Sequence, residues 1–225
     1  AIIKYNKDGR AYYLRGNLYY DIGEEKKALA DYEEAVKQDK KDYELYIGIY
    51  QSIKNHGAKE NAQKYLNQAM EIKGEKAEDL LYKGQISYLL GDYKTAVTDL
   101  TKAKEDGQQK ASYYLGLTYE AQGDTDKAQS YVKEYLDSGA ATSYELYDLG
   151  SSELNDGDYE EALTYFNAGL ALEKVPNKQN LMKSAIAAYE YSGDFDSAKT
   201  MLKDYLEEYP SDEDAQKEST FLETR

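Results

Sequence analysis

The stretch LLGDYKTAVTDLTKA, residues 89–103, decides the fold because the chain repeats its pattern along most of its length. A glycine and an aspartate, Gly91 and Asp92, precede a segment in which Ala96, Leu100 and Ala103 recur at helical spacing. Glycine can end one helix with a positive φ and aspartate can cap the next, so the pattern predicts a helix, a turn and a second helix. Related stretches begin at Asp21, Ala121, Leu154 and Tyr191.

The repeat has a nearly constant length. Aligned on one alanine, the units place Ala28, Ala62, Ala96, Ala128, Ala162 and Ala198 at intervals of 34, 34, 32, 34 and 36 residues. A glycine precedes five of these alanines, at Gly16, Gly48, Gly84, Gly116 and Gly150, and Ile186 takes that place in the sixth unit. Because two short helices cannot bury their apolar stripes alone, we expect successive hairpins to stack as a solenoid.

At these residues the sequence resembles the tetratricopeptide repeat (TPR), a helix hairpin of about 34 residues. The first unit, YYLRGNLYYDIGEEKKALADYEEAV, matches the family's pattern of small and aromatic residues most closely. The resemblance implies an all-α, right-handed superhelical solenoid of antiparallel helix hairpins. It also implies a lead-in over residues 1–9, about six repeats over residues 10–210, and a capping helix over residues 211–225. We expect Ser211 to cap that last helix.

The family's fold implies that the first helix of each repeat lines a concave groove. Mapped onto this chain, the inward-facing positions are rich in tyrosine, which is abundant here (26 Tyr against 3 Phe and no Trp). A tyrosine face can bury apolar side chains or prolines of an extended peptide, or one face of a sugar. The predicted groove residues are Tyr13, Asn17, Tyr20, Tyr46, Tyr82, Gln85, Tyr88, Tyr113, Tyr114, Tyr144 and Tyr147. The competing interpretation is that many of these tyrosines belong to the core.

Composition narrows the class of partner. The chain has 225 residues, 41% hydrophobic, and a formal net charge of −15, which disfavours nucleic acid and favours neutral or basic protein partners. Some family members clamp a peptide's terminal carboxylate, but Tyr13 and Ile49 stand where the family's Lys and second Asn would be, so that ligand is disfavoured. No apolar run is long enough to span a bilayer, so no membrane insertion is predicted.

The sequence predicts no catalytic residue, cofactor or metal site. His56 is the only histidine and there is no cysteine, so neither a Ser-His-Asp relay nor a multi-histidine metal site can be assembled. The acidic stretch 156–161 lacks the ligand spacing of a calcium loop, and a turn followed by a helix cap explains it better. An enzyme is therefore the least favoured class of function.

We expect a non-enzymatic scaffold that holds a peptide or partner segment in its groove. The alternative is an extracytoplasmic, membrane-anchored spacer of the bacterial lipoprotein type, which could associate through its ends or bind glycan or cell wall. This alternative draws on the missing cysteines and on a start at Ala1, which suggests a trimmed product with a targeting segment upstream. On the same grounds an extracytoplasmic location is slightly favoured over a cytoplasmic one.

Overall fold

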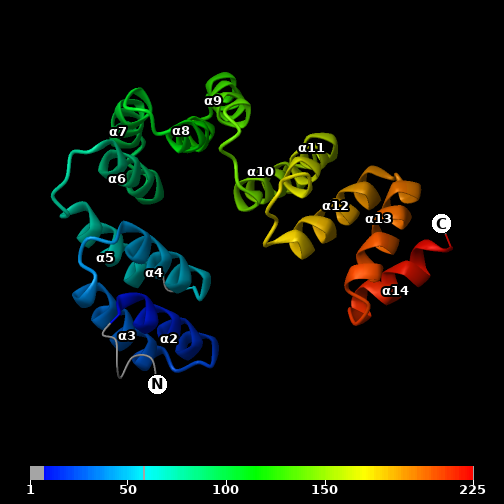
Figure 1. The fold of residues 1–225 in the computed structure, drawn as a ribbon, viewed down its shortest axis with the longest axis horizontal. Coiled ribbons are helices and arrows are strands. Elements are labelled where there is room, and N and C mark those ends of the chain that lie inside the picture. Colours follow the sequence, from blue (N-terminus) through cyan, green and yellow to red (C-terminus); the bar gives the residue numbers. More distant parts are fainter. Residues whose placement is uncertain (1–7, 58, 225) are drawn as a thin grey trace. The chain divides into compact units, whose positions relative to one another are not determined.

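The computed structural model describes residues 8–57 and 59–224, and the side chains of 59–61 lie outside this description. Every regular element within the described residues is an α-helix (Figure 1). The helices are α2 (Gly9–Asp21), α3 (Glu25–Gln38), α4 (Tyr43–Asn55), α5 (Lys59–Met70), α6 (Ala77–Leu90), α7 (Tyr93–Glu105), α8 (Lys110–Ala121), α9 (Thr125–Asp137), α10 (Ser143–Asp156), α11 (Tyr159–Leu170), α12 (Lys178–Ser192), α13 (Phe195–Glu208) and α14 (Glu213–Leu222).

The chain divides into two compact units, Ala1–Gly139 and Ala140–Arg225. The first unit contains four helix hairpins, from α2/α3 to α8/α9, and the second contains α10/α11, α12/α13 and the single helix α14. Within each hairpin the second helix packs back on the first. The predicted all-α architecture of stacked hairpins is therefore confirmed. The domain boundaries expected from the sequence stay a prediction.

The turn inside the hairpins follows from the glycine and aspartate of the repeated stretch. Gly91 ends α6 in the left-handed region, at φ +82°. The next residue, Asp92, accepts a hydrogen bond from the Thr95 backbone N–H at 3.2 Å and so caps α7. Equivalent side-chain caps are formed by Asp124, Asp158 and Asp194.

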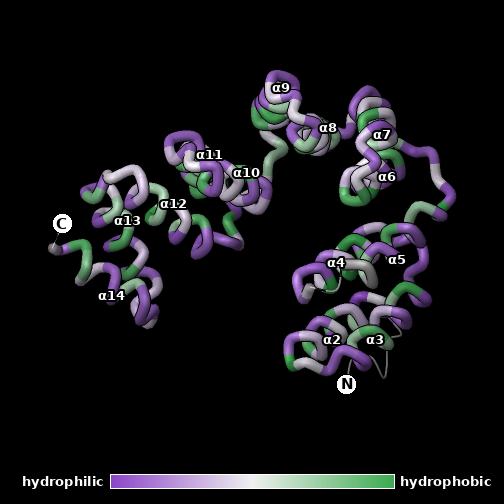
Figure 2. Tube along the Cα trace, turned by 180° about the vertical axis from the view of Figure 1, so that it is seen from behind, coloured by the Kyte–Doolittle hydropathy of each residue, from purple (hydrophilic) through white to green (hydrophobic). Residues whose placement is uncertain are grey.

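The two helices of a hairpin approach most closely where the first helix carries glycine. A Cβ atom added to Gly84 would lie 2.5 Å from Leu100 Cγ, and one added to Gly150 would lie 2.6 Å from Phe166 Cε1. Leu100 and Phe166 are fully buried because they fill the space that these glycines leave. Hydrophobic and hydrophilic segments alternate along the tube in Figure 2.

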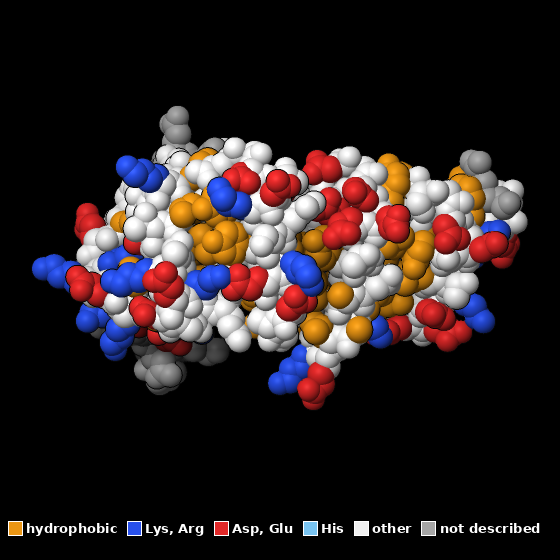
Figure 3. Space-filling model, turned by 90° about the horizontal axis from the view of Figure 1, so that it is seen from above, with side chains coloured by type: hydrophobic (Ala, Val, Ile, Leu, Met, Phe, Trp, Pro, Cys, Tyr) orange, Lys and Arg blue, Asp and Glu red, His pale blue; other side chains and the backbone are white. Residues whose placement is uncertain are grey.

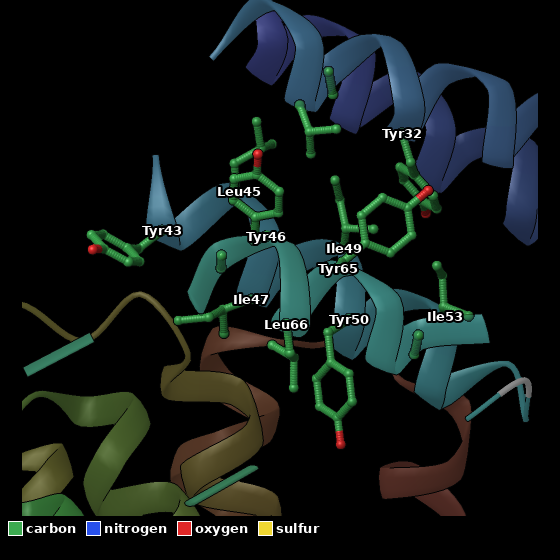
Figure 4. Close-up of a cluster of buried hydrophobic side chains, with 14 of the residues drawn as sticks. Tyr32, Tyr43, Leu45, Tyr46, Ile47, Ile49, Tyr50, Ile53, Tyr65 and Leu66 are labelled. Carbon is green, nitrogen blue, oxygen red and sulfur yellow. The ribbon is translucent and has the colours of Figure 1, made fainter. Parts of the chain in front are cut away.

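The second hairpin does not follow the glycine alignment that the sequence suggested. Helix α2 starts at Gly9 and α4 starts at Tyr43, 34 positions later, so Tyr50 takes the place of Gly16 in the second hairpin. Gly48 instead faces the preceding hairpin, where an added Cβ would lie 2.9 Å from the Tyr13 hydroxyl oxygen. The alignment of Gly48 with Gly16 is therefore wrong by two residues. Tyr50 fits because its ring packs into the core (Figure 4).

Tyrosines form much of the buried core of the first unit. Tyr32, Tyr50 and Tyr65 are among its largest fully buried side chains, and Figure 4 shows Tyr65 on the side of α5 that faces Tyr32. The Tyr32 hydroxyl is satisfied inside the core, donating to Asn17 Oδ1 at 2.7 Å and lying 2.8 Å from Ser52 Oγ. Such partners allow a phenol to replace an aliphatic core residue.

Helix α14 is capped by Asp212, not by Ser211 as the sequence suggested. The Asp212 carboxylate accepts hydrogen bonds from the Ala215 backbone N–H (3.2 Å) and the Tyr205 hydroxyl (2.6 Å), and Lys183 Nζ lies 2.6 Å away. These donors, Lys183 first, hold the pKa of Asp212 well below its usual range. Three donors reach position 212, which makes it the more favourable cap.

A carboxyl pair lies between α12 and α14. One carboxyl oxygen of Glu190 is buried without a hydrogen-bond partner among the described residues. Burial, followed by the negative charge of Glu218, raises the pKa of Glu190. Because a raised carboxyl pKa means that the folded state prefers the protonated form, this pair costs stability as the pH rises through that pKa.

We predict that Gly84→Ala destabilises the protein by about 1 kcal/mol, because the overpacking against Leu100 exceeds the helix propensity gained by alanine. Chemical denaturation monitored by circular dichroism measures the change. In a Leu100→Ala background the added methyl group has room, so Gly84→Ala should there cost nothing or stabilise. An equal cost in both backgrounds would contradict the close approach.

We predict that Glu190→Gln raises the melting temperature at pH 7 and that this gain disappears near pH 4, where the wild-type carboxyl is itself protonated. Thermal unfolding of wild type and variant at both pH values measures the difference. Glu207→Gln, on the exposed face of α13, is the matched control. A gain that is independent of pH would show that charge at position 190 is not the cause.

Candidate functional site

First helices of three successive hairpins in the first unit line a cavity of about 230 Å³. Helix α4 contributes Ile47 and Gln51, and α6 contributes Tyr82 and Gln85, one turn apart on the same face. The complete lining is Glu44, Ile47, Gly48, Gln51, Leu81, Tyr82, Gln85, Lys110 and Tyr114.

A second cavity, of about 300 Å³, adjoins the first and shares Glu44 and Tyr82 with it. It lies over the N-terminal ends of α2, α4 and α6 and is lined by Arg10, Lys41, Asp42, Tyr43, Glu44, Glu78, Asp79 and Tyr82. We call the two cavities together the first-helix groove. Carboxylates outnumber cations in this second cavity, so this end of the groove is acidic.

Hydrogen bonds and ion pairs hold the side chains that join the two cavities. The Tyr82 hydroxyl donates to Glu44 Oε1 at 3.0 Å, and Arg10 lies 3.0 Å from the other Glu44 oxygen and 3.4 Å from Asp42. Burial, followed by the hydrogen bond to Glu44, raises the pKa of Tyr82, so its phenol stays a neutral donor. Glu78 lines the second cavity and has no basic partner within the described part of the chain.

The structure brings three of the eleven predicted groove residues together in this groove. Tyr82, Gln85 and Tyr114 all line its first cavity, of about 230 Å³. Tyr144 and Tyr147 belong to the second unit, where Tyr144 is exposed and the Tyr147 ring lies 6.2 Å from that of Phe166. Whether any of these side chains contacts a ligand stays a prediction.

Three of the predicted residues are buried instead. Tyr20, Tyr46 and Tyr113 are 7%, 6% and 4% exposed, which supports a packing role, and none of them lines the groove cavities. The Tyr20 ring lies 4.4 Å from the His56 ring and is tilted by 39° to it, and the Tyr113 ring lies 5.5 Å from that of Tyr135.

The remaining predicted residues are half-buried. Asn17 is engaged in the core by the Tyr32 hydroxyl, and the Tyr13 ring lies 6.2 Å from the Tyr32 ring. Burial, followed by the charge of Glu120, raises the pKa of Tyr88. None of these three side chains lines the groove cavities.

Sequence reasoning missed Glu44, Ile47 and Gln51, which α4 contributes to the groove. The cause is the two-residue misalignment at Gly48, which moved the predicted groove position of this helix to Tyr46, a residue that does not line the groove cavities. The exact 34-residue interval between the capping residues Asp8 and Asp42 would have given the correct register.

No cluster of potential metal ligands occurs in the part of the chain that the structure describes. His56, the only histidine, ends α4 and lies 3.5 Å from an Asp21 carboxylate oxygen. The described helices also include none that is both long and apolar enough to cross a bilayer.

Comparison with known proteins gives one curated relative and several structural neighbours. The chain is 28% identical to human Superkiller complex protein 3 over 162 residues, which is 70% of this chain and only 9% of that protein. It resembles the structure of PilW, a widely conserved type IV pilus biogenesis factor, with 18% identity, 93% and 97% of the two chains covered and a TM-score of 0.53. It also resembles a thermophilic TPR protein from Thermus thermophilus, with 19% identity, 80% and 98% covered and a TM-score of 0.54.

Models of the tetratricopeptide repeat match residues 9–42, 113–178 and 179–212. The matched segments include hairpins of both compact units and agree with the hairpins observed there. Proteins with this fold are typically non-catalytic scaffolds for protein interaction. The chain belongs to the tetratricopeptide repeat family.

Proposed function

We propose that the protein is a non-enzymatic scaffold that binds an extended peptide segment of a neutral or basic partner in the first-helix groove. The observation that carries this proposal is the pair of adjoining cavities over α2, α4, α6 and α8, one partly apolar and one acidic. A continuous row of first helices suits an extended chain better than a compact ligand.

Each part of the groove offers a different contact to such a peptide. The amides of Gln51 and Gln85 can donate to and accept from a peptide backbone. The half-buried ring of Tyr114 can contact an apolar side chain, while Ile47 and Leu81, which are 5% and 7% exposed, contribute only a small apolar area to the cavity wall. At the acidic end, Glu78 can pair with a lysine or arginine of the peptide. The chain's net charge of −15 supports the same preference.

Selection from a random peptide library displayed on phage tests the proposal. We expect the selected peptides to be enriched in lysine or arginine beside an apolar residue. Gln51→Ala/Gln85→Ala should weaken their binding roughly tenfold, the cost of about one or two hydrogen bonds. Glu78→Lys should weaken basic peptides selectively. Calorimetric titration measures both changes.

Gln122→Ala/Gln129→Ala provides the matched control, since it removes one exposed amide just after α8 and one on α9, both outside the groove. This control variant should bind the selected peptides with the same affinity as the wild type. If the groove variants bind the selected peptides as tightly as the wild type does, the groove assignment is refuted.

A second candidate function, self-association through the N-terminal hairpin, is supported by an exposed apolar stripe on α2. Leu14 and Leu18 of α2 and Ile22, which follows its last residue, recur every four residues and are exposed. Leu18 is 65% exposed, whereas its equivalent in the third hairpin, Ile86, is 0% exposed and packs into the core of the preceding hairpins. The stripe thus has the chemistry of a hairpin–hairpin contact, and its proposed occupant is a second copy of this chain.

We predict that light scattering after gel filtration shows a mass that rises with concentration towards a dimer, and that Leu18→Glu abolishes the rise. Thr98→Glu, at an exposed position of α7, should leave it unchanged. A single-chain mass for the wild type at all concentrations would reject self-association. The extracytoplasmic location, the membrane anchor and glycan binding stay predictions.

A further inference from the structure

A cavity of about 800 Å³ lies between the second helices α3 and α5, and Lys41 is the one lining residue that it shares with the first-helix groove. Its wall also includes the connection from α3 to α4, the side chain of Tyr46 on α4, and the residues that follow α5. The lining comprises Glu33, Val36, Lys37, Lys40, Lys41, Tyr46, Lys64, Tyr65, Gln68, Glu71, Ile72 and Lys73.

The cavity is basic although the chain is strongly acidic. Five lysines and two glutamates line it, in a protein whose net charge is −15. Lys40, Lys41 and Lys73 have no carboxylate within ion-pair distance among the described residues. By contrast, charged side chains of both signs are interspersed over the face of the molecule in Figure 3.

The two remaining lysines are already engaged. Lys64 lies 3.6 Å from Glu33 Oε1 and 4.9 Å from the centre of the Tyr65 ring, and Lys37 lies 3.7 Å from Glu34. In the neighbouring pair of second helices, α7 and α9, Lys104 reaches Glu134 at 2.6 Å. The cavity between α3 and α5 therefore keeps a positive charge that its own carboxylates do not neutralise.

The inner wall of the cavity is apolar. Val36, Tyr46 and Tyr65 are buried and Ile72 is half-buried, so a ligand would contact both hydrocarbon and aromatic rings. The Tyr65 hydroxyl is buried without a hydrogen-bond partner within the described residues. Because this oxygen has almost no accessible surface, a ligand in the cavity would contact the lysines and the apolar wall and not the hydroxyl.

We propose that this cavity binds a small amphipathic anion, a single alkyl or aryl chain that carries a phosphate, sulfate or carboxylate group. The anionic group would lie among Lys40, Lys41 and Lys73, and the chain would cover Val36 and Ile72. The volume falls within the range of small-molecule sites, about 300 to 1,000 Å³. A lipid bilayer is a less suitable partner, because an anionic membrane surface repels a chain of this net charge.

Titration calorimetry with octyl phosphate, hexyl phosphate, inorganic phosphate and hexyltrimethylammonium tests the proposal. Affinity should rise about three- to fourfold for each methylene buried, with inorganic phosphate weaker than both esters and the cation not bound. Lys40→Gln/Lys73→Gln should weaken octyl phosphate about tenfold or more and reduce the dependence of binding on salt.

Lys26→Gln/Lys54→Gln removes the same charge from exposed positions outside the cavity and should bind as the wild type does. Thermal unfolding establishes that both double variants are folded. Three outcomes would each overturn the proposal: octyl phosphate binds equally weakly to both lysine double variants, inorganic phosphate binds as tightly as octyl phosphate, or octyl phosphate does not bind at all. So would tighter binding of an oligoglutamate peptide, or co-sedimentation with phosphatidylglycerol vesicles that depends on Lys40 and Lys73.

Discussion

The close approach of the two helices within a hairpin is the contact on which the rest of the structure depends. Where Gly84 meets Leu100, or Gly150 meets Phe166, there is no room for a single methyl group unless the Leu100 or Phe166 side chain shifts. The hairpin so formed is too thin to bury its remaining apolar surface, and Ile86 shows the solution by packing into the core of the preceding hairpins. Stacking therefore aligns first helices on one side and second helices on the other. One surface of the stack is lined by first helices and another by second helices.

Features that depend on neighbouring residues could be predicted from the sequence. The turn at Gly91 and the cap at Asp92 need only a positive φ and a carboxylate in reach of the next helix, and both occur as expected. The register of the second hairpin depends instead on which residue lies at the helix crossing. Tyr50 can replace a glycine there only because the surrounding core accepts its ring, and this could not be inferred from one sequence. The misplacement of the α4 contribution to the groove followed from that error.

The tyrosines limited the prediction of the site for a related reason. A phenol ring fits a core as well as a groove if its hydroxyl finds a partner, as Tyr32 does with Asn17 and Ser52. Tyr113 and Tyr114 are adjacent on α8, yet the first is buried and the second lines the groove. The position of a tyrosine on its helix therefore does not tell a core residue from a groove residue, because the next hairpin covers one ring and leaves the other accessible.

Helix α4 connects the two candidate sites of the first unit. Successive residues of a helix point about 100° apart, so Tyr46 lines the basic cavity while Ile47 lines the groove. Lys41, just before this helix, lies at the edge of both the basic cavity and the acidic end of the groove. A ligand in either site would contact this segment and restrict its motion. Because binding free energies are linked reciprocally, any such effect of an anion on peptide affinity would equal the effect of the peptide on the anion.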